Sequence, residues 1–162
     1  MLLVANGCLR QAQAATNDQR PATNMASQKS FLLEIVTPAS KVFSAQVKAI
    51  IAPGEAGYFG VLPHHTNMLA TLKTGHLKVE TAEKTVYFAI ARGLAEVMAS
   101  GVKILAETAE EASTIDVERA KQAKERADRR LKEGRKQWDL ERAEAALARA
   151  ANRLKVVELM KS

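Results

Sequence analysis

The sequence predicts a chain of two parts, an antiparallel β-sandwich followed by an antiparallel α-helical hairpin. From Phe31 to Glu107 it consists of short β-branched segments whose apolar residues alternate with polar ones, broken by Gly, Pro, Ser and Thr. Beyond Glu107 the apolar period changes to that of a helix. The 162 residues have room for one ordinary domain or two small ones. We therefore predict a β-sandwich over 31–110 and a helical hairpin over 111–162.

The first 30 residues form an extension with neither the alternation of a strand nor the apolar stripe of a helix, so we expect it to be disordered. Its apolar stretch is too short for a secretory signal or a membrane span. Met25 opens a segment that has the form of a natural start, so residues 1–24 are expected to be dispensable. The single Cys8 excludes an internal disulfide framework.

Four segments predict the strands of the sandwich. They are FLLEIVTP, KVFSAQVKAIIAP, GHLKVETAEKTVYFAIARG and LAEVMASGVKILAE. In the third, Leu77 and Val79 alternate with Lys78 and Glu80, and residues 82–84 are expected to turn the chain back. These short intervals are typical of an all-β sandwich or barrel. Helical crossovers between the segments are missing, which argues against a parallel sheet.

Two helices are predicted in the carboxy-terminal part. Residues 113–116, Ser-Thr-Ile-Asp, have the form of a capping box and predict a helix start. The first helix follows with apolar residues at helical spacing until Gly134 interrupts it: Val117, Ala120, Ala123, Ala127 and Leu131. The second is expected to begin near Trp138, and its apolar residues step by three and four: Leu140, Ala143, Leu147, Ala150, Leu154 and Val157. The short connection predicts an antiparallel hairpin.

The seam between these helices is rich in alanine. A buried methyl or methylene group contributes about 0.8 kcal/mol, so alanine allows a close approach but gives little burial at each crossing. We therefore expect a hairpin whose docking on the sandwich is near balance.

The net charge of +6 suggests a nucleic-acid partner, but its distribution argues against one. Residues 1–30, 31–106 and 107–162 each carry two more basic than acidic residues. Binding to a phosphate backbone needs a concentrated basic face, and no segment supplies one. We expect no nucleic acid among the partners.

The stretch GEAGYFGVLPHHTN, residues 54–67, is the candidate for a site in the first part. It lacks the lysine of a phosphate-binding loop, and Pro63 stands where the helix of such a loop would begin. A metal site could use His64, His65 and His76, but no cysteine or carboxylate completes a familiar ligand set. A glycine-rich corner between two strands is the simpler interpretation. No serine lies in a nucleophile elbow, so we expect no catalytic residue and no metal.

Several motifs together resemble a known family. GYFGVLPHH, preceded by Pro53-Gly54, is similar to the G-x-[FL]-G-[IV]-[LY]-P-x-H signature of the epsilon subunit of the F-type ATP synthase. ARGLAEVMASGVKILAETAE resembles that family's next strands, IDVERAKQAKERADRRL the start of its hairpin, and RAANRLKV its end. The similarity runs from about Phe31 to Met160. Two readings from other classes stay open: a small β-barrel metalloprotein using the three histidines, and a free-standing helical adaptor.

The resemblance implies a non-catalytic rotor subunit of the central stalk, peripheral on the cytoplasmic side of the inner membrane. Its implied partners are the gamma subunit, the ring of c subunits and, through an extended inhibitory hairpin, the alpha/beta head. It places Tyr58, His64 and His65 in the loop that contacts the c ring. The chain departs from the family pattern at two of these positions, since many relatives carry Glu at the place of Tyr58 and Gly or Asn at that of His64.

No obligatory cofactor is implied, but some bacterial members of the family bind ATP as a regulatory ligand in the hairpin. Their motif [IL]-D-x-x-R-A is complete here, and a carboxylate before it and two arginines on the second helix also match. The implied nucleotide-binding residues are Glu110, Ile115, Asp116, Arg119, Ala120, Arg149 and Arg153.

The charges of the second helix give an independent reason to expect a phosphate near Arg149 and Arg153. Neither residue has an acidic neighbour at helical spacing, and like charges at i, i+4 repel. A bound phosphate would turn this repulsion into charge-assisted contacts. The alternative is a solvated basic face in which Asp116 only caps the helix. Arg126, which also lacks an acidic neighbour at helical spacing, shows that such a pattern is not confined to the predicted site.

Overall fold

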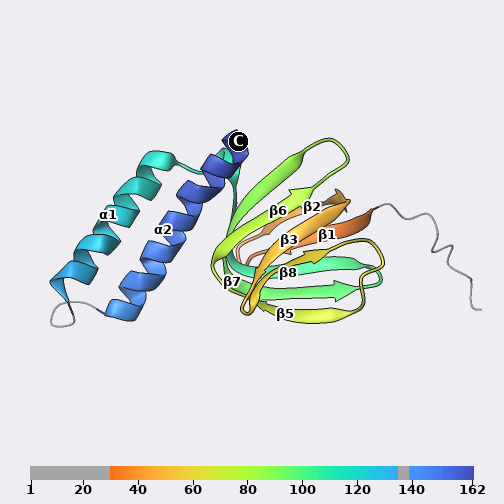
Figure 1. Cartoon of the computed structure of the whole chain (residues 1–162), viewed down its shortest axis with the longest axis horizontal. Helices are drawn as coiled ribbons and strands as arrows, with labels where there is room; N and C mark the ends of the chain where they lie inside the picture. Colours follow the sequence, from red (N-terminus) through yellow and green to blue (C-terminus); the bar gives the residue numbers. More distant parts are fainter. Residues whose placement is uncertain (1–29, 135–138) are drawn as a thin grey trace, which may run out of the picture.

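The computed structural model describes residues 30–134 and 139–162 and has two parts, a β-sandwich and a helical hairpin beside one end of it (Figure 1). The sandwich has eight strands. They are β1 (Phe31–Val36), β2 (Lys41–Val47), β3 (Ala49–Gly54), β4 (Gly57–Val61), β5 (Met68–Leu72), β6 (Gly75–Glu80), β7 (Thr85–Met98) and β8 (Gly101–Glu111). The predicted fold class is confirmed. The expectations for residues 1–29, including Met25, lie outside the described residues.

The hairpin follows a short 3₁₀ turn at Ala112–Thr114 and consists of α1 (Val117–Glu133) and α2 (Leu140–Lys161). α2 lies between α1 and the sandwich, so α1 is the outer helix (Figure 1). The predicted helix start near Trp138 falls outside the described residues, and the described part of α2 begins after its cap at Asp139. Neither of the two described helices combines the length and the apolar character that a membrane crossing requires.

The strands follow the order β2-β1-β8-β7-β5-β3-β4, and β6 pairs with both β3 and β7. Neighbouring strands are antiparallel with one exception, because β1 and β8 pair in parallel, with Leu33 opposite Val102 and Ile35 opposite Ile104. These strands are the first and last of the sandwich, so no hairpin turn constrains their direction. The sheet as a whole is therefore not parallel, as predicted, and this one pair is the exception.

The glycine-rich stretch contains more structure than the predicted corner. β4 runs through it and pairs with β3 over its whole length. The chain turns at Gly57, whose φ of 139° is a conformation that favours glycine. Phe59 is half-buried and Val61 is buried, so the strand alternates like the others although it holds two glycines. The actual corner is the loop 62–67 that follows β4.

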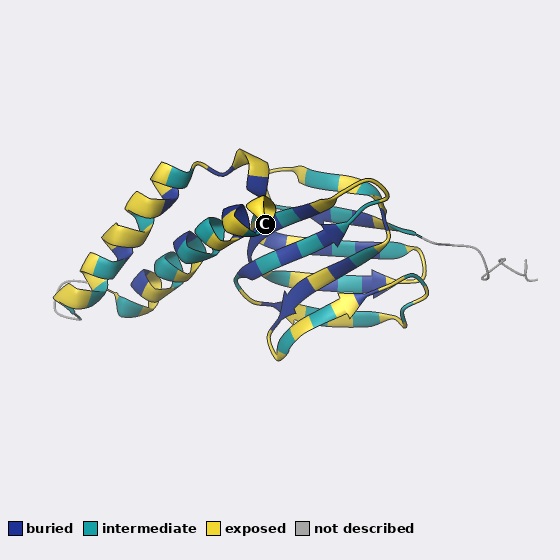
Figure 2. Ribbon diagram, turned by 45° about the horizontal axis from the view of Figure 1, so that its top comes forward, coloured by how far each residue is buried: buried dark blue, intermediate teal, exposed yellow. Residues whose placement is uncertain are grey.

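The core of the sandwich comes from the inward residues of each strand, which appear as dark blue bands in Figure 2. Its largest fully buried side chains include Phe88, Leu33, Ile35, Ile50, Leu72 and Leu77. Phe88 meets Phe43 edge to face, with ring centroids 5.3 Å apart. Such contacts between large apolar side chains contribute most of the stability of a small sandwich.

The two helices meet along the predicted alanine seam. Ala120 and Ala127 of α1 and Ala143 and Ala150 of α2 are buried, as the helical spacing predicts. The predicted capping box is wrong in detail, because Ser113 donates to a carboxylate oxygen of Glu111 and does not cap a helix. A 3₁₀ turn occupies residues 112–114, and the helix begins three residues later than a cap at Ser113 would place it.

A second, smaller apolar cluster joins the hairpin to the sandwich. It comprises the buried residues Ala89, Ala112, Ile115, Val156 and Val157, with Tyr87 and Val117 packed against them. α2 contributes only the two valines, each worth about 1.5–3 kcal/mol when fully buried. The apolar part of the docking is therefore a few kcal/mol, so polar contacts at the same junction have a large share in deciding whether the hairpin stays docked.

Candidate functional site

An ion pair joins the end of β8 to the second half of α2. Arg153 donates from Nε to Oε2 of Glu110 at 2.9 Å and from its terminal NH2 group to Oε1 at 2.5 Å. This bidentate geometry is the favourable one for guanidinium and carboxylate. The Arg153 hydrogen bond, followed by its charge, holds the pKa of Glu110 below the ordinary value despite partial burial. Both groups therefore remain charged near neutral pH.

Beside this ion pair lies a cavity of about 340 Å³, within the size range of small-molecule sites. β8, the connection to α1, α1 itself and α2 all contribute to it. Its walls are formed by Glu110, Thr114, Ile115, Asp116, Arg119, Ala120, Ala123, Arg126 and Arg153. Six of the seven residues predicted to bind nucleotide thus line one cavity, although they come from three separate stretches of the chain.

Asp116 has a structural role in the site. The backbone N–H of Arg119 donates to its Oδ1 at 3.0 Å, so Asp116 is the N-cap of α1. This is the alternative that the sequence left open for the motif. Capping positions the first turn of α1, which carries Arg119 and Ala120 into the cavity wall. The side chain of Ala120 is small and buried, and it forms part of the cavity wall.

Arg126 is the functional candidate that the sequence reasoning missed. It lies seven residues after Arg119, and both line the cavity. The sequence interpretation used Arg126 only as a comparison outside the site. The signal that could have found it is the helical period, since residues seven apart face the same way. Together with Arg153 it raises the number of guanidinium groups at the cavity to three, against the carboxylates of Glu110 and Asp116.

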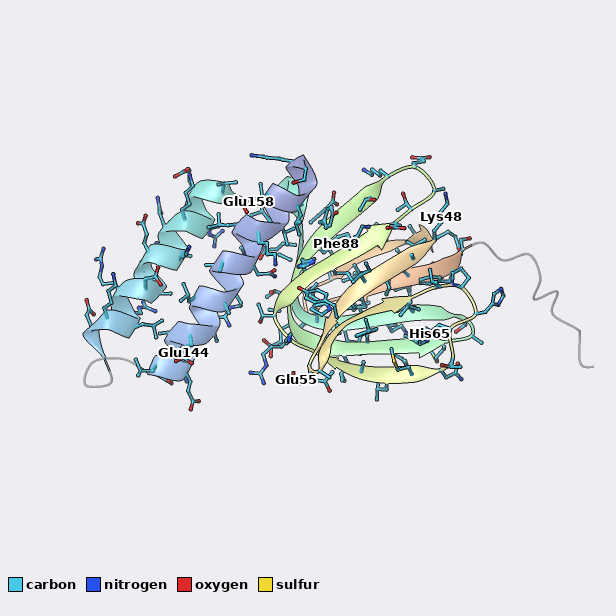
Figure 3. All side chains as sticks on the ribbon, in the orientation of Figure 1. Lys48, Glu55, His65, Phe88, Glu144 and Glu158 are labelled. Atoms are coloured by element: carbon cyan, nitrogen blue, oxygen red, sulfur yellow. The ribbon has the colours of Figure 1, made fainter. Side chains whose placement is uncertain are left out.

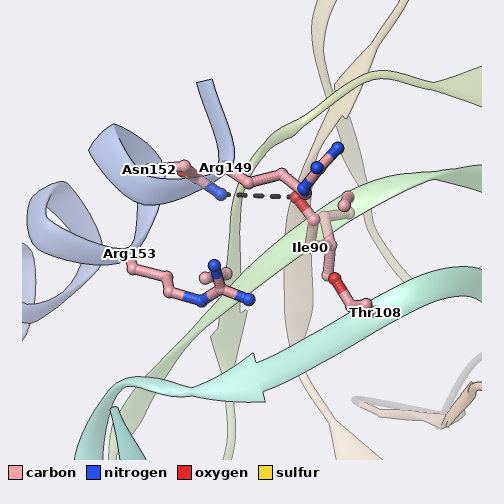
Figure 4. Close-up of a pocket in the computed structure, with 7 residues that line it drawn as sticks. Ile90, Thr108, Arg149, Asn152 and Arg153 are labelled. Carbon is pink, nitrogen blue, oxygen red and sulfur yellow. Dashed lines mark hydrogen bonds between the residues drawn. The ribbon is translucent and has the colours of Figure 1, made fainter. Parts of the chain in front are cut away.

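Arg149 is the predicted nucleotide-binding residue that the structure places elsewhere. It lines a smaller hollow of about 10 Å³ between α2 and the sheet, with Asn152, Arg153, Thr108 and Ile90 among its neighbours. Figure 4 shows Arg149 and Arg153 extending from α2 toward β7 and β8. The predicted repulsion between these arginines is reduced without any ligand, because Glu110 neutralises Arg153.

The three residues predicted to contact the c ring are not brought together. Tyr58 lies at the start of β4 and shares a hydrogen bond of 2.7 Å with Nδ1 of His76 on β6. His64 and His65 follow the other end of β4, and His65 lies at the end of the sandwich remote from the helices (Figure 3). The backbone N–H of His65 donates to the carbonyl of Leu62, and exposed His64 has a φ of 66°. Only the two histidines share the corner.

The three histidines of the alternative metal site are likewise separate. His76 bonds Tyr58, and Nδ1 of His65 lies 2.8 Å from the carbonyl oxygen of Thr66. Across residues 30–134 and 139–162, no three side chains among His, Cys, Asp and Glu are grouped as metal ligands would be.

The fold defines a class of protein in which a β-sandwich carries a helical hairpin with a charged cavity at the junction. Two family models match it along the chain, described as the beta-sandwich domain of the ATP synthase delta/epsilon chain over residues 30–112 and its long alpha-helix domain over residues 113–158. The chain belongs to the ATP synthase delta/epsilon family.

Individual relatives agree with this assignment. An ATP synthase epsilon chain of Syntrophobacter fumaroxidans is 52% identical over 126 residues, which cover 78% of this chain and 94% of the relative. One from Desulforamulus reducens is 45% identical over 130 residues, covering 80% and 98%. Among solved structures, a chain of the Euglena gracilis mitochondrial ATP synthase matches with a TM-score of 0.60 at 24% identity, covering 82% of this chain and 80% of that one. The last likeness concerns the fold alone.

Proposed function

We propose that the chain is a non-catalytic subunit of the rotor of an F-type ATP synthase, peripheral on the cytoplasmic side of the inner membrane. Its sandwich couples the gamma subunit to the c ring, and its hairpin senses ATP and restrains ATP hydrolysis. Family membership supports the role in the stalk. The observation that carries the sensing role is the cavity at the junction, because filling it joins both helices to the sandwich.

The contact with gamma is proposed for the outward face of β1, β7 and β8. Leu94 and Leu105 lie directly opposite each other there and are 41% and 43% exposed. They border a hollow of about 380 Å³ that Val36 and Pro38 also line. Apolar hollows of this kind on a sheet face favour a protein partner over water.

The contact with the c ring is proposed for the corner that holds His64 and His65. Leu62 and Leu69 flank this corner and are 63% and 69% exposed, which is unusual for large apolar side chains. The corner therefore offers two apolar side chains around two imidazoles. Tyr58 is left out of this proposed surface, because its hydroxyl group bonds His76 on β6.

ATP is the proposed ligand of the cavity, since three guanidinium groups suit a polyphosphate. Arg153 is already paired with Glu110, so Arg119 and Arg126 are the groups we assign to the phosphates. Neither carboxylate is suited to activate water. Glu110 has a lowered pKa and is held by Arg153, and Asp116 caps α1. The ligand is therefore expected to be sensed and not hydrolysed.

Binding at the junction would control the position of the hairpin. A ligand bound only by the docked form stabilises it by RT ln(1 + [L]/Kd), which is about 2.7 kcal/mol at a hundredfold excess over Kd. The valines of α2 contribute an amount of the same order to docking. Nucleotide occupancy could therefore decide between the docked and the undocked form.

This proposal predicts an ATP-dependent rise in melting temperature that Arg126→Ala removes. Saturating ATP should raise the melting temperature of the wild-type chain by about 5 °C or more. Arg126 has an exposed side chain in the cavity wall, so Arg126→Ala should leave the melting temperature without ligand nearly unchanged. Arg153→Ala is a poorer choice, because it also breaks the ion pair with Glu110. Differential scanning calorimetry with and without ATP measures both quantities.

Arg129→Ala is the matched control, since Arg129 is an exposed arginine of the same helix that does not line the cavity. Its response to ATP should equal that of the wild type. If the two variants lose the response equally, the effect is one of general charge. If the wild type shows no rise at millimolar ATP, the cavity is not a nucleotide site.

A further inference from the structure

α2 is fastened to the sandwich by a hydrogen-bonding residue as well as by the ion pair. Nδ2 of Asn152 donates to the carbonyl oxygen of Gly75 on β6 at 2.8 Å and approaches that of Ile90 on β7 at 3.3 Å. Figure 4 shows the second of these contacts. Because Gly75 and Ile90 are paired across the two strands, Asn152 reaches both strands at one point. This contact fixes α2 against the start of β6.

His76 is the next residue on β6 and is half-buried beside this contact. Its ring lies against Tyr58, with ring centroids 4.6 Å apart, and its Nδ1 shares a hydrogen bond with the Tyr58 hydroxyl group. Lys155, less than one helical turn beyond Asn152 on α2, is close enough for its charge to act on the imidazole. The sheet therefore presents a titratable ring to a cation of the docked helix.

Five elements around the contact of α2 with β6 carry the other ionisable groups. They are Tyr58 on β4, Lys78 and Glu80 on β6, Tyr87 on β7, Glu110 on β8, and Arg149, Arg153 and Glu158 on α2. Lys78 is paired with Glu80, and Arg153 with Glu110. Of the charged groups on the docked helix, Lys155 is the one whose charge lowers the pKa of His76.

We propose that the contact of α2 with β6 is a proton-sensitive latch, held closed by Asn152 and opened when His76 gains a proton opposite Lys155. The latch rests on the mobile hairpin of the proposed function and adds a second input to it, independent of the nucleotide. Acidification would release the hairpin into the extended form to which inhibition is assigned.

The environment of His76 decides whether docking weakens or strengthens as the pH falls. Burial, and then the charge of Lys155, lower the pKa of His76 below its ordinary value of 6.5 in the docked form. Undocking moves Lys155 away from the ring, so the undocked form binds the proton more tightly. The latch therefore stabilises docking fully above about pH 6.5 and loses that contribution as the pH falls toward the lowered pKa. Glu110 has a pKa lowered from 4.5, so its ion pair stays intact through this window.

The test measures the distance between the two parts of the full chain as a function of pH. Cys8→Ser removes the native thiol, and Lys48→Cys and Glu144→Cys place spin labels on the exposed far end of the sandwich and on α2 (Figure 3). At pH 8 without ATP we expect mainly one docked distance. Between pH 7 and pH 5 a longer distance should grow, with a change in the docked-to-undocked ratio of up to tenfold per pH unit, the limit for one proton.

Four variants test whether the pH-dependent undocking comes from the latch. His76→Gln, which cannot gain a proton, should abolish the pH dependence, and Lys155→Met should reduce it. His64→Gln is the matched control, because that exposed histidine lies beyond the other end of β4. Asn152→Ala should raise the undocked population at every pH, while circular dichroism of the sandwich shows that the fold is retained. A pH response that persists in His76→Gln, or a wild type that stays docked down to pH 5, overturns the latch.

Glu110→Gln distinguishes a hairpin that moves without a His76 latch from a hairpin that does not move at all. It weakens the ion pair with Arg153 without using His76. If Glu110→Gln populates the longer distance while the wild type shows no pH response, the hairpin moves and only the latch is wrong. If neither Glu110→Gln nor Asn152→Ala ever gives the longer distance, the hairpin is fixed, and both the latch and the sensing mechanism fail.

Discussion

Removing residues 112–162 from the chain should raise the ATP hydrolysis rate of the assembled ATP synthase several-fold while leaving the complex coupled. The deletion takes away α1, α2 and the 3₁₀ turn, but the main core cluster consists entirely of residues of the sandwich. The sandwich should therefore still fold and hold its place in the rotor. What is lost is the hairpin, whose outer helix presents an exposed, charged surface away from the sandwich (Figure 2).

The assay compares ATP hydrolysis by complexes reconstituted with the full and the shortened chain. Proton pumping in the same preparation shows whether coupling survives. Arg129→Glu in the full chain, an exposed site on α1, should reproduce part of the increase if the extended hairpin meets acidic surfaces of the catalytic head. Equal hydrolysis rates with both chains would remove the inhibitory role, whatever the hairpin binds.

Gly93→Ala should destabilise the sandwich by about 3 kcal/mol, which lowers the melting temperature by about 6–12 °C. A Cβ atom at Gly93 would lie 2.1 Å from the backbone oxygen of Leu105 and 2.9 Å from Cα of Ala106. These are backbone atoms of the neighbouring strand, so the clash can be relieved only by moving β7 away from β8. The adjacent Arg92 has a φ of 27°, which shows that the strand is already bent here.

Gly60→Ala is the matched control in β4. A Cβ atom there would meet the backbone oxygen of Ile50 at 3.8 Å, an ordinary van der Waals distance. Its free energy of unfolding should change by less than about 1 kcal/mol. Urea unfolding followed by circular dichroism compares the two. Equal small effects would mean that β7 and β8 do not approach as closely as described.

The strands with a regular alternation of apolar and polar residues could be predicted from the sequence. A strand in which glycines interrupt that alternation could not. In β6, Leu77 and Val79 alternate with Lys78 and Glu80 and face the core as expected. β4 was not predicted because a glycine at its start and another in its interior conceal the alternation of Phe59 and Val61. The parallel pairing of β1 with β8 joins residues some seventy positions apart, and no local pattern reports on such a contact.

The site was predictable only in part, for a related reason. Six lining residues followed from the family resemblance, which supplied a motif that periodicity alone would not have singled out. Arg126 was missed because it was compared only with residues three and four positions away, whereas Arg119, which lines the cavity with it, lies seven positions away. Arg153 was expected to lack an acidic neighbour because only residues of its own helix were considered. Its acidic partner Glu110 lies on β8 and is 43 residues away in the chain. The rotation of each helix about its axis decides these contacts, and it is set by packing.

Calorimetric titration of ATP into the full chain at pH 8 measures the nucleotide binding at the junction on which the proposed sensing role rests. We expect saturable binding of one ATP per chain, abolished by Arg119→Ala and retained in Arg129→Ala. Absence of saturable binding by the wild-type chain at millimolar ATP, or equal binding by Arg119→Ala, would contradict the proposed sensing role.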